Sequence, residues 1–115
     1  MQKIRLMVAE EAKEHLETIL NYFKNIDDVS IIGTHNDGNS LLNALRVTQT
    51  DVLLIDLVMP YCDGMKVIEE LKTRKDKYCQ PHKIIVMTQF MSNYISSKLN
   101  QYGVDYVIMK PLDVK

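Results

Sequence analysis

Short continuous apolar runs alternate along this chain with stretches in which apolar residues recur every three or four positions. Continuous runs are typical of buried strands, and the wider spacing is typical of helices with one apolar face. The runs predict strands at Ile4–Ala9, Val29–Thr34, Asp51–Asp56, Lys83–Thr88 and Val104–Met109. The spaced residues predict four helices, with apolar faces at Leu16, Ile19 and Phe23, at Leu41 and Leu45, at Val67 and Leu71, and at Ile95 and Leu99.

Five strands that alternate with helices predict an α/β fold, a doubly wound parallel sheet with helices on both faces. Right-handed crossovers bring the carboxyl ends of all the strands to one edge of such a sheet. In the strand order 2-1-3-4-5 the first and third strands are neighbours, and ligands bind near the point where the order reverses. The residues that end the strands are therefore the candidates for chemistry.

Polar side chains stand at the carboxyl end of four of the predicted strands. Glu10 and Glu11 follow the first strand, Asp56 ends the third, Thr88 ends the fourth and Lys110 follows the fifth. Three carboxylates brought together would repel one another, and a hard divalent cation such as Mg²⁺ would relieve that repulsion. The hydroxyl and the ammonium would then hold phosphoryl oxygens. This set contains the parts needed for in-line transfer of a phosphoryl group to an aspartate.

The same residues carry a resemblance to a known family. In order along the chain they are Glu10-Glu11, the segment Asp56–Pro60 (DLVMP), Asp63-Gly64, Thr88 and Lys110-Pro111. With these motifs at these spacings, the chain resembles the receiver domains of bacterial two-component response regulators over essentially its whole length. The resemblance implies a flavodoxin/CheY-like fold and one receiver domain, residues 1–115. It also implies a signalling switch that phosphorylates itself and turns over no external substrate.

The resemblance assigns a role to each motif. Asp56 would be the phosphoacceptor, Thr88 and Lys110 would bind the phosphoryl group, and the Lys110–Pro111 peptide would be cis, an isomer that is cheap only before proline. Mg²⁺ would be the cofactor. The implied metal ligands are Glu10, Glu11, Asp56 and the backbone carbonyl of Val58.

The resemblance also implies partners. A histidine kinase or a phosphotransfer protein would supply the phosphoryl group, and an output domain that binds DNA would lie outside this chain. The segments IIGTHNDG, QPHKIIVMTQF and VDYVIMKP look similar to the receiver of the master sporulation regulator of spore-forming bacteria. That narrower likeness predicts a place in a phosphorelay that controls transcription during sporulation.

Three positions depart from the family pattern. Glu11 stands where receivers usually have Asp, and its extra methylene must fit a metal site of tight octahedral geometry. Gln89 follows Thr88 where the family has a small residue. Val107 takes the place of the Tyr or Phe that switches with the threonine, so the usual coupling between those two side chains is in question.

The end of the sequence carries a further expectation. Receivers continue past the Lys-Pro pair into a fifth helix, whereas this sequence stops at Lys115. That helix would cover the same sheet face as the first helix, and without it apolar surface would be exposed. The chain is then either a fragment of a longer regulator or a protein whose bare face is covered by another copy, which predicts self-association as a dimer.

Composition and residue spacing exclude several classes of protein and of binding site. The 115 residues suit one domain, and 46% hydrophobic with 25% charged residues is typical of a globular protein. The net charge of −1 gives no reason to expect contact with nucleic acid or a membrane surface. Cys62, Cys79 and the three histidines have no spacing typical of a metal site. No apolar run is long enough for a membrane span or a secretory signal, so the cytoplasm is the expected location.

Two alternative functions stay open. The chain could be a degenerate receiver that binds partners without phosphorylation, a hypothesis favoured by the departures at Glu11, Gln89 and Val107. It could also be a phosphatase of the haloacid-dehalogenase type, which likewise uses a strand-end Asp, a hydroxyl and a Lys. That family needs a second Asp two residues after the nucleophile, and Val58 occupies this position.

Overall fold

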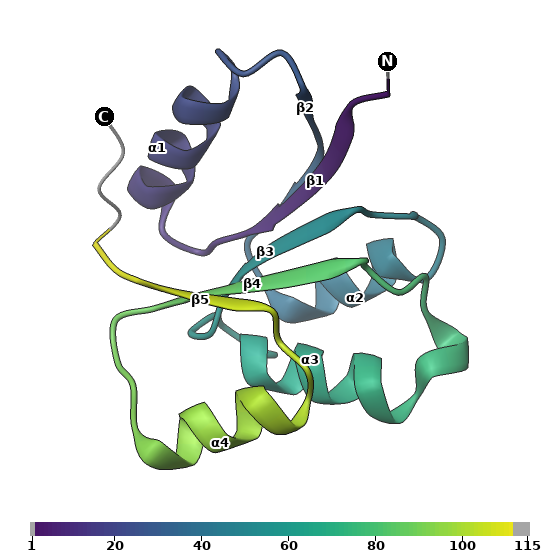
Figure 1. The fold of residues 1–115 in the computed structure, drawn as a ribbon, viewed down its shortest axis with the longest axis vertical. Coiled ribbons are helices and arrows are strands. Elements are labelled where there is room, and N and C mark those ends of the chain that lie inside the picture. Colours follow the sequence, from purple (N-terminus) through teal and green to yellow (C-terminus); the bar gives the residue numbers. More distant parts are fainter. Residues whose placement is uncertain (1, 112–115) are drawn as a thin grey trace.

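The computed structural model describes residues 2–111 of the chain. Strands and helices alternate along them, as the apolar pattern predicts (Figure 1). The predicted strands and helices are confirmed, with boundaries that differ by at most a few residues; a short 3-10 helix, η1, is additional. The elements are β1 (Ile4–Ala9), α1 (Lys13–Phe23), β2 (Val29–His35), α2 (Gly38–Leu45), β3 (Val52–Asp56), α3 (Gly64–Thr73), η1 (Lys75–Lys77), β4 (Lys83–Thr88), α4 (Asn93–Gln101) and β5 (Tyr106–Met109).

The five strands form one parallel sheet with the predicted order β2-β1-β3-β4-β5. The register places Ala9 of β1 opposite Ile55 of β3, and Thr88 of β4 opposite Met109 of β5. The carboxyl ends of β1, β3, β4 and β5 therefore lie at the same edge of the sheet, where the chain leaves each strand for a loop.

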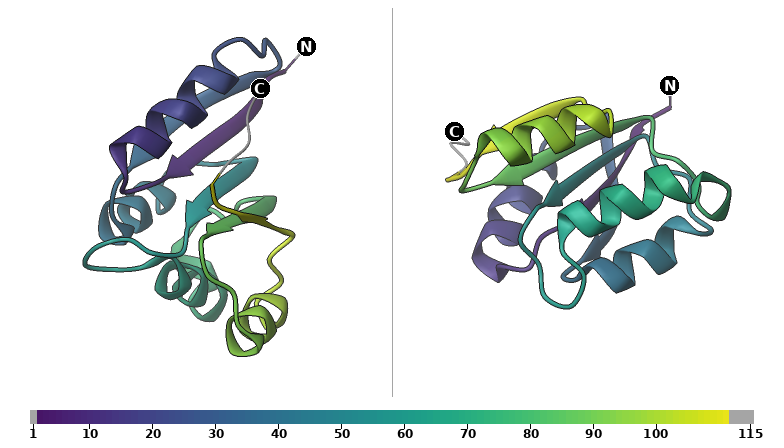
Figure 2. Two further views of the ribbon diagram at one scale, coloured as in Figure 1. Left: turned by 90° about the vertical axis from the view of Figure 1, so that its left-hand side faces the viewer. Right: turned by 90° about the horizontal axis from the view of Figure 1, so that it is seen from below.

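Helices cover both faces of the sheet, but unequally. Among residues 2–111, the α2, α3 and α4 helices lie on one face and α1 is the one helix on the other (Figure 2). The larger buried cluster joins Leu41 of α2, Ile68 of α3 and Leu99 of α4 to one side of the strands. A smaller cluster joins Ile19 of α1 to the opposite side, at Leu54 and Met87. The fold is thus doubly wound, with its main core on the three-helix side.

Side chains and glycine set the helix ends. The carboxylates of Asp37 and Asp63 and the hydroxyl of Ser92 each accept a hydrogen bond from a backbone N–H in the first turn of α2, α3 and α4. Such N-caps satisfy donors that have no partner within the helix. Gly103 follows α4 with a φ of 75°, a conformation that favours glycine, so the predicted stop of this helix is confirmed.

The face covered by α1 alone contains an open apolar groove of about 430 Å³. Among the described residues β5 is the last element, and all four of its residues are exposed. The groove is lined by apolar side chains of α1 and of all five strands, among them Ile19, Phe23, Leu54, Ile85 and Ile108. The predicted exposure of apolar surface on the α1 side is therefore confirmed for this part of the chain.

An ion pair ties the strands together at the edge opposite their carboxyl ends. The carboxylate of Asp51 accepts the backbone N–H of Arg5 at 2.7 Å and its guanidinium N–H groups at 3.0 and 3.1 Å. These hydrogen bonds hold the pKa of Asp51 at about 2, below its ordinary value of 3.8. A carboxylate with a lowered pKa in the folded protein stabilises that state only while it is ionised.

We expect the stability contributed by Asp51 to be present above pH 4 and lost as the pH falls from about 4 to about 2. Urea denaturation across this range should show that Asp51→Asn flattens the fall in unfolding free energy relative to the wild type. Asp76→Asn, which changes an exposed carboxylate, is the matched control. An unchanged acid slope in Asp51→Asn would contradict the assignment.

Candidate functional site

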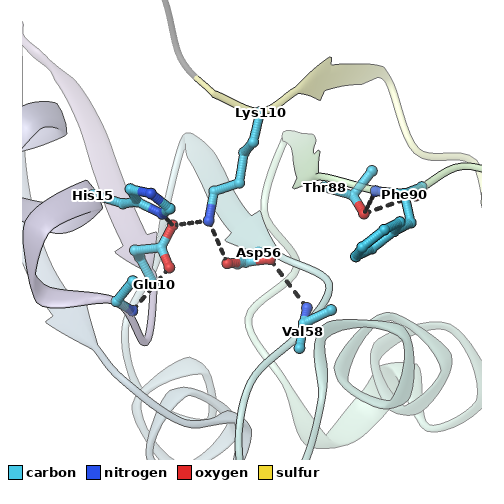
Figure 3. A network of polar contacts seen from close by, with 8 residues as sticks. Glu10, His15, Asp56, Val58, Thr88, Phe90 and Lys110 are labelled. Atoms are coloured by element: carbon cyan, nitrogen blue, oxygen red, sulfur yellow. Dashed lines mark hydrogen bonds and ion pairs between the residues drawn. The ribbon is translucent and has the colours of Figure 1, made fainter.

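Three charged side chains meet at the carboxyl edge of the sheet (Figure 3). The Lys110 ammonium lies 2.7 Å from Oδ2 of Asp56 and 2.6 Å from Oε1 of Glu10. The three groups are almost fully enclosed: the exposed fractions of their side chains are 5% for Lys110, 8% for Asp56 and 0% for Glu10. Residues 10, 56 and 110 are far apart in the sequence, and the strand ends bring them together as predicted.

Backbone hydrogen bonds fix this arrangement. The Glu10 N–H donates to the carbonyl of His35 at 2.9 Å, and the Lys110 N–H donates to the carbonyl of Thr88 at 2.9 Å, so both residues extend the sheet by one step. The Asp56 carboxylate accepts the backbone N–H of Val58 through Oδ1 at 3.0 Å. One oxygen of Asp56 is thus held by the following loop and the other by the ammonium.

Burial and charge shift the pKa of two members of this cluster. Burial raises the pKa of Glu10, the Lys110 ammonium opposes that shift, and the nearby Asp56 carboxylate adds to it. For Lys110, burial alone would lower the pKa, but the carboxylates of Asp56 and Glu10 outweigh it and the pKa is raised. Lys110 is therefore a fixed cation that compensates two carboxylates in an enclosed site.

A pocket of about 180 Å³ opens beside Asp56. Its polar side chains come from Glu11, His15, Asp56, Gln89 and Lys110, and Ala12, Val58 and Phe90 complete the lining. Glu11 is exposed, in contrast with the buried Glu10, so the two adjacent acids face different surroundings. A phosphoryl group that reaches Asp56 would have to enter through this pocket.

His15 is a pocket residue to which the sequence assigned no role. Its Nδ1 lies 3.8 Å from Oε1 of Glu10, and this buried nitrogen has no hydrogen-bond partner within the described part of the chain. The sequence carries no clear signal for this position. His15 lies in the first turn of α1, whereas Glu11 precedes that helix, so helical spacing does not relate the two residues.

Thr88 is buried at the end of β4, but its hydroxyl does not contact Asp56 or Lys110 among the bonds of this structure. Its Oγ1 donates to the carbonyl of Phe90 at 2.8 Å and accepts the N–H of Phe90 at 3.1 Å. The threonine therefore lies near the predicted site while its hydrogen bonds run to the loop that follows.

The residues around the pocket supply some of the ligands that Mg²⁺ prefers, which are oxygen donors together with water. The carboxylates of Glu11 and Asp56 line the same pocket, and Val58 lines it beside them. In residues 2–111 no group of three or more His, Cys, Asp or Glu side chains is placed to hold a metal ion. The donor set thus fits an ion held by two carboxylates with backbone and water oxygens, since Glu10 is paired with Lys110.

Two further predicted positions lie in β5 and directly after it. The Lys110–Pro111 peptide is cis, as the resemblance implies. Val107 is 42% exposed and paired in the ladder with Val86. The position that carries a Tyr or Phe in the family pattern therefore presents only a small aliphatic side chain here.

Residues 6–115 match the response regulator receiver domain family. The chain belongs to this family. Receiver domains are phosphorylation-dependent signalling switches of two-component systems rather than conventional enzymes, and they typically bind Mg²⁺. None of the helices in the described residues has the length and apolar character needed to cross a membrane.

Solved receiver structures share the fold. The signal receiver domain of NarL from Mycobacterium tuberculosis is 19% identical, with a TM-score of 0.85 over 98% of this chain and 88% of that one. RcsB from Salmonella typhimurium is 25% identical, with a TM-score of 0.81 over 98% of this chain and 54% of that one. The isolated receiver domain of RcsB from Salmonella enterica, solved with the phosphomimetic BeF₃⁻, is 24% identical with a TM-score of 0.80 over 97% and 80%. The chain thus spans about half the length of the longer RcsB chain.

Proposed function

We propose that this receiver domain is a phosphoacceptor switch that takes one phosphoryl group on Asp56 with the help of Mg²⁺. The observation that carries the proposal is the Lys110 ammonium, 2.7 Å from the Asp56 carboxylate at the wall of an open pocket. A buried carboxylate beside a fixed cation and an accessible pocket is a nucleophile with charge stabilisation already in place.

The chemistry follows from the positions of these groups. One carboxylate oxygen of Asp56 attacks the phosphorus of the donor, the bond to the donor's leaving group breaks, and the leaving group departs with the bonding electrons. The product is an aspartyl phosphate whose added negative charge lies next to Lys110. Lys110 binds a phosphoryl oxygen, and Glu10 keeps the ammonium in position at 2.6 Å. Glu11, Asp56 and the Val58 carbonyl would hold Mg²⁺, which when bound would supply further positive charge to the phosphoryl oxygens.

The decisive experiment is phosphorylation followed by intact mass. The protein is incubated with acetyl phosphate and Mg²⁺, and we expect a gain of one phosphoryl group. The gain should be absent from Asp56→Asn and absent when EDTA removes the metal. Asp76→Asn, an exposed Asp-to-Asn change elsewhere, should behave as the wild type. A folded wild-type protein that gains no mass would overturn the proposal.

A histidine kinase or a phosphotransfer protein is the expected phosphodonor, because the chain belongs to the receiver family. The output we infer is a DNA-binding domain outside this chain, acting in the cytoplasm; RcsB, a structural relative, was solved bound to the promoter rprA. The narrower hypothesis, a phosphorelay that controls transcription in sporulation, rests on the sequence likeness alone. Phosphoryl transfer from the phosphotransfer protein of such a relay would test it.

The second candidate is a receiver that acts as an interaction module without phosphorylation. Two observations favour it: the Thr88 hydroxyl is bonded to Phe90 instead of facing the pocket, and Glu11 replaces the usual Asp. In that case, the mass experiment would show no gain while partner binding would be the same with and without Mg²⁺. The haloacid-dehalogenase alternative finds no support, because Val58 faces the pocket where that reaction needs an acid.

We infer that two copies of the chain associate through the apolar groove beside α1, since its lining is apolar and a net charge of −1 gives little repulsion between copies. Light scattering at rising concentration should show a dimer. Ile108→Lys, which places a charge in the groove, should shift the protein towards monomer. Val47→Lys, at an exposed valine outside the groove lining, should not. A wild-type monomer at every concentration would contradict the inference.

A further inference from the structure

The Thr88 hydroxyl forms a closed local pair with the backbone of Phe90. Oγ1 donates its proton to the Phe90 carbonyl at 2.8 Å and accepts the Phe90 N–H at 3.1 Å, so both backbone polar groups of Phe90 depend on one side chain (Figure 3). Short-range bonds of this kind between a hydroxyl and the backbone two residues on hold a turn in shape. The conformation of the chain at Phe90 is thus set by the orientation of the Thr88 hydroxyl.

A hydroxyl carries a single proton, and this limits what Thr88 can do. While that proton is given to the Phe90 carbonyl, it is unavailable to a phosphoryl oxygen on Asp56. Donation to a phosphoryl oxygen therefore breaks the bond to the Phe90 carbonyl. Because Thr88 does not line the pocket beside Asp56, its Oγ1 must also turn towards the phosphoryl group and away from the Phe90 N–H. The attraction is strong enough to compete, since a hydrogen bond to an anionic oxygen is roughly twice as strong as one to a neutral carbonyl.

Phe90 is well placed to report this change. Its side chain is 70% exposed although it is large and apolar, and it lines the pocket beside Asp56. Val107 occupies the position where the family pattern has an aromatic residue, so no aromatic side chain at that position can respond to phosphorylation. In residues 2–111, Thr88 is therefore linked to an aromatic residue through the backbone of the loop after β4. The family pattern would instead link the threonine to an aromatic side chain on β5.

We propose that Phe90 is the aromatic residue that displays the phosphorylation state of this receiver, released when the Thr88 hydroxyl exchanges the Phe90 backbone for the phosphoryl group. The inference rests on the proposed phosphorylation of Asp56. It adds which residue responds to phosphorylation. That residue is Phe90, which is connected to Thr88 through the backbone two residues along the chain.

The test uses the absence of tryptophan from the chain. Phe90→Trp and Val107→Trp each introduce a single fluorophore, one at the proposed readout and one at the family position. Each variant is treated with acetyl phosphate and Mg²⁺, and tryptophan emission and anisotropy are followed while intact mass reports the phosphoryl content. We expect the indole at position 90 to change in proportion to the mass gain, and the indole at position 107 to change by less than about a third as much.

Substitutions at Thr88 in the Phe90→Trp background separate a change relayed by the hydroxyl from direct quenching by the phosphoryl group. At equal phosphoryl content, Thr88→Ser should keep the signal and Thr88→Ala should lose it. An equal signal in Thr88→Ala overturns the inference, as does a larger response at position 107. A mass gain without any change at position 90 overturns the inference alone, whereas no mass gain in the wild type overturns the proposed function and the inference with it.

Hydrogen exchange of the unsubstituted protein gives a second readout. The Phe90 amide is protected by Oγ1 of Thr88, so phosphorylation should speed its exchange by roughly fivefold or more. The amide of Ile95, which donates to the Ser92 hydroxyl in the first turn of α4, is the internal reference and should be unaffected. Unchanged exchange at Phe90 in fully phosphorylated protein would also overturn the inference.

Discussion

Replacement of Gly64 by alanine is expected to lower the free energy of unfolding by about 3 kcal/mol or more and to slow phosphorylation of Asp56 by about tenfold. Gly64 opens α3, and its N–H donates to the carbonyl of Leu57 at 2.8 Å. A Cβ on this residue would overlap the carbonyl of Asp56 and lie 2.8 Å from Cα of Leu57. Since those atoms are backbone, relief of the clash must displace the residue that carries the reacting carboxylate.

Chemical denaturation measures the first effect, and the initial rate of mass gain with acetyl phosphate measures the second. Gly33→Ala is the matched control, because a Cβ there meets Cε of Met7 at 3.5 Å and Nε2 of His35 at 3.6 Å, which are ordinary contacts. We expect that variant to stay within about 1 kcal/mol of the wild type. A Gly64→Ala protein with wild-type stability and rate would show that the loop after β3 does not constrain Asp56.

Lys110→Met should destabilise the folded protein by about 3 kcal/mol at pH 7 and slow phosphorylation by about 100-fold. The substitution keeps the apolar stem and removes the ammonium, which leaves the Glu10 and Asp56 carboxylates enclosed without a cation. Denaturation by urea gives the stability, and mass gain with acetyl phosphate gives the rate. Lys83→Met removes an ammonium that is 61% exposed and 3.7 Å from Asp105, and it should cost no more than about 1 kcal/mol.

The stability lost in Lys110→Met should shrink as the pH is lowered. Burial already raises the pKa of Glu10 in the wild type, and removal of the opposing ammonium raises it further. A carboxyl group with a raised pKa in the folded state favours folding below its unfolded pKa, and that contribution disappears as the pH rises through the folded pKa. The difference between the variant and the wild type should therefore be smaller at pH 5 than at pH 7. A difference that grows on acidification would contradict this account of the cluster.

The meeting of Asp56 with Lys110 was accessible from the sequence because parallel strands carry their final residues to one edge. The sequence did not show that Glu10 and Glu11, although adjacent, would have different surroundings. Glu10 still bonds to the sheet through His35 and is buried against Lys110, whereas Glu11 is one residue further along and exposed. A one-residue step at a strand end changes the surroundings completely, and the apolar pattern does not locate strand ends that finely.

Other features depend on side-chain conformations that the sequence does not encode in a readable pattern. The Thr88 hydroxyl has two ways to be satisfied, and its local bonds to Phe90 become visible only in three dimensions. The turn η1 has no apolar periodicity; it is held in part by the side-chain amide of Gln80, which donates to the carbonyls of Leu71 and Lys75 at 3.0 and 3.3 Å. The alternation of strands and helices predicts a parallel sheet with its strand ends at one edge, and the family resemblance supplies the strand order; neither predicts these local arrangements.

The unequal covering of the sheet has a thermodynamic consequence. A second copy of the chain that fills the groove beside α1 removes apolar side chains such as Phe23, Leu54 and Ile85 from water. Transfer of apolar surface out of water lowers the heat capacity, so calorimetry should give a negative heat-capacity change for that association. The enthalpy of the association will then become more favourable on warming, and the midpoint of thermal unfolding will rise with protein concentration because the folded state is coupled to the assembled one.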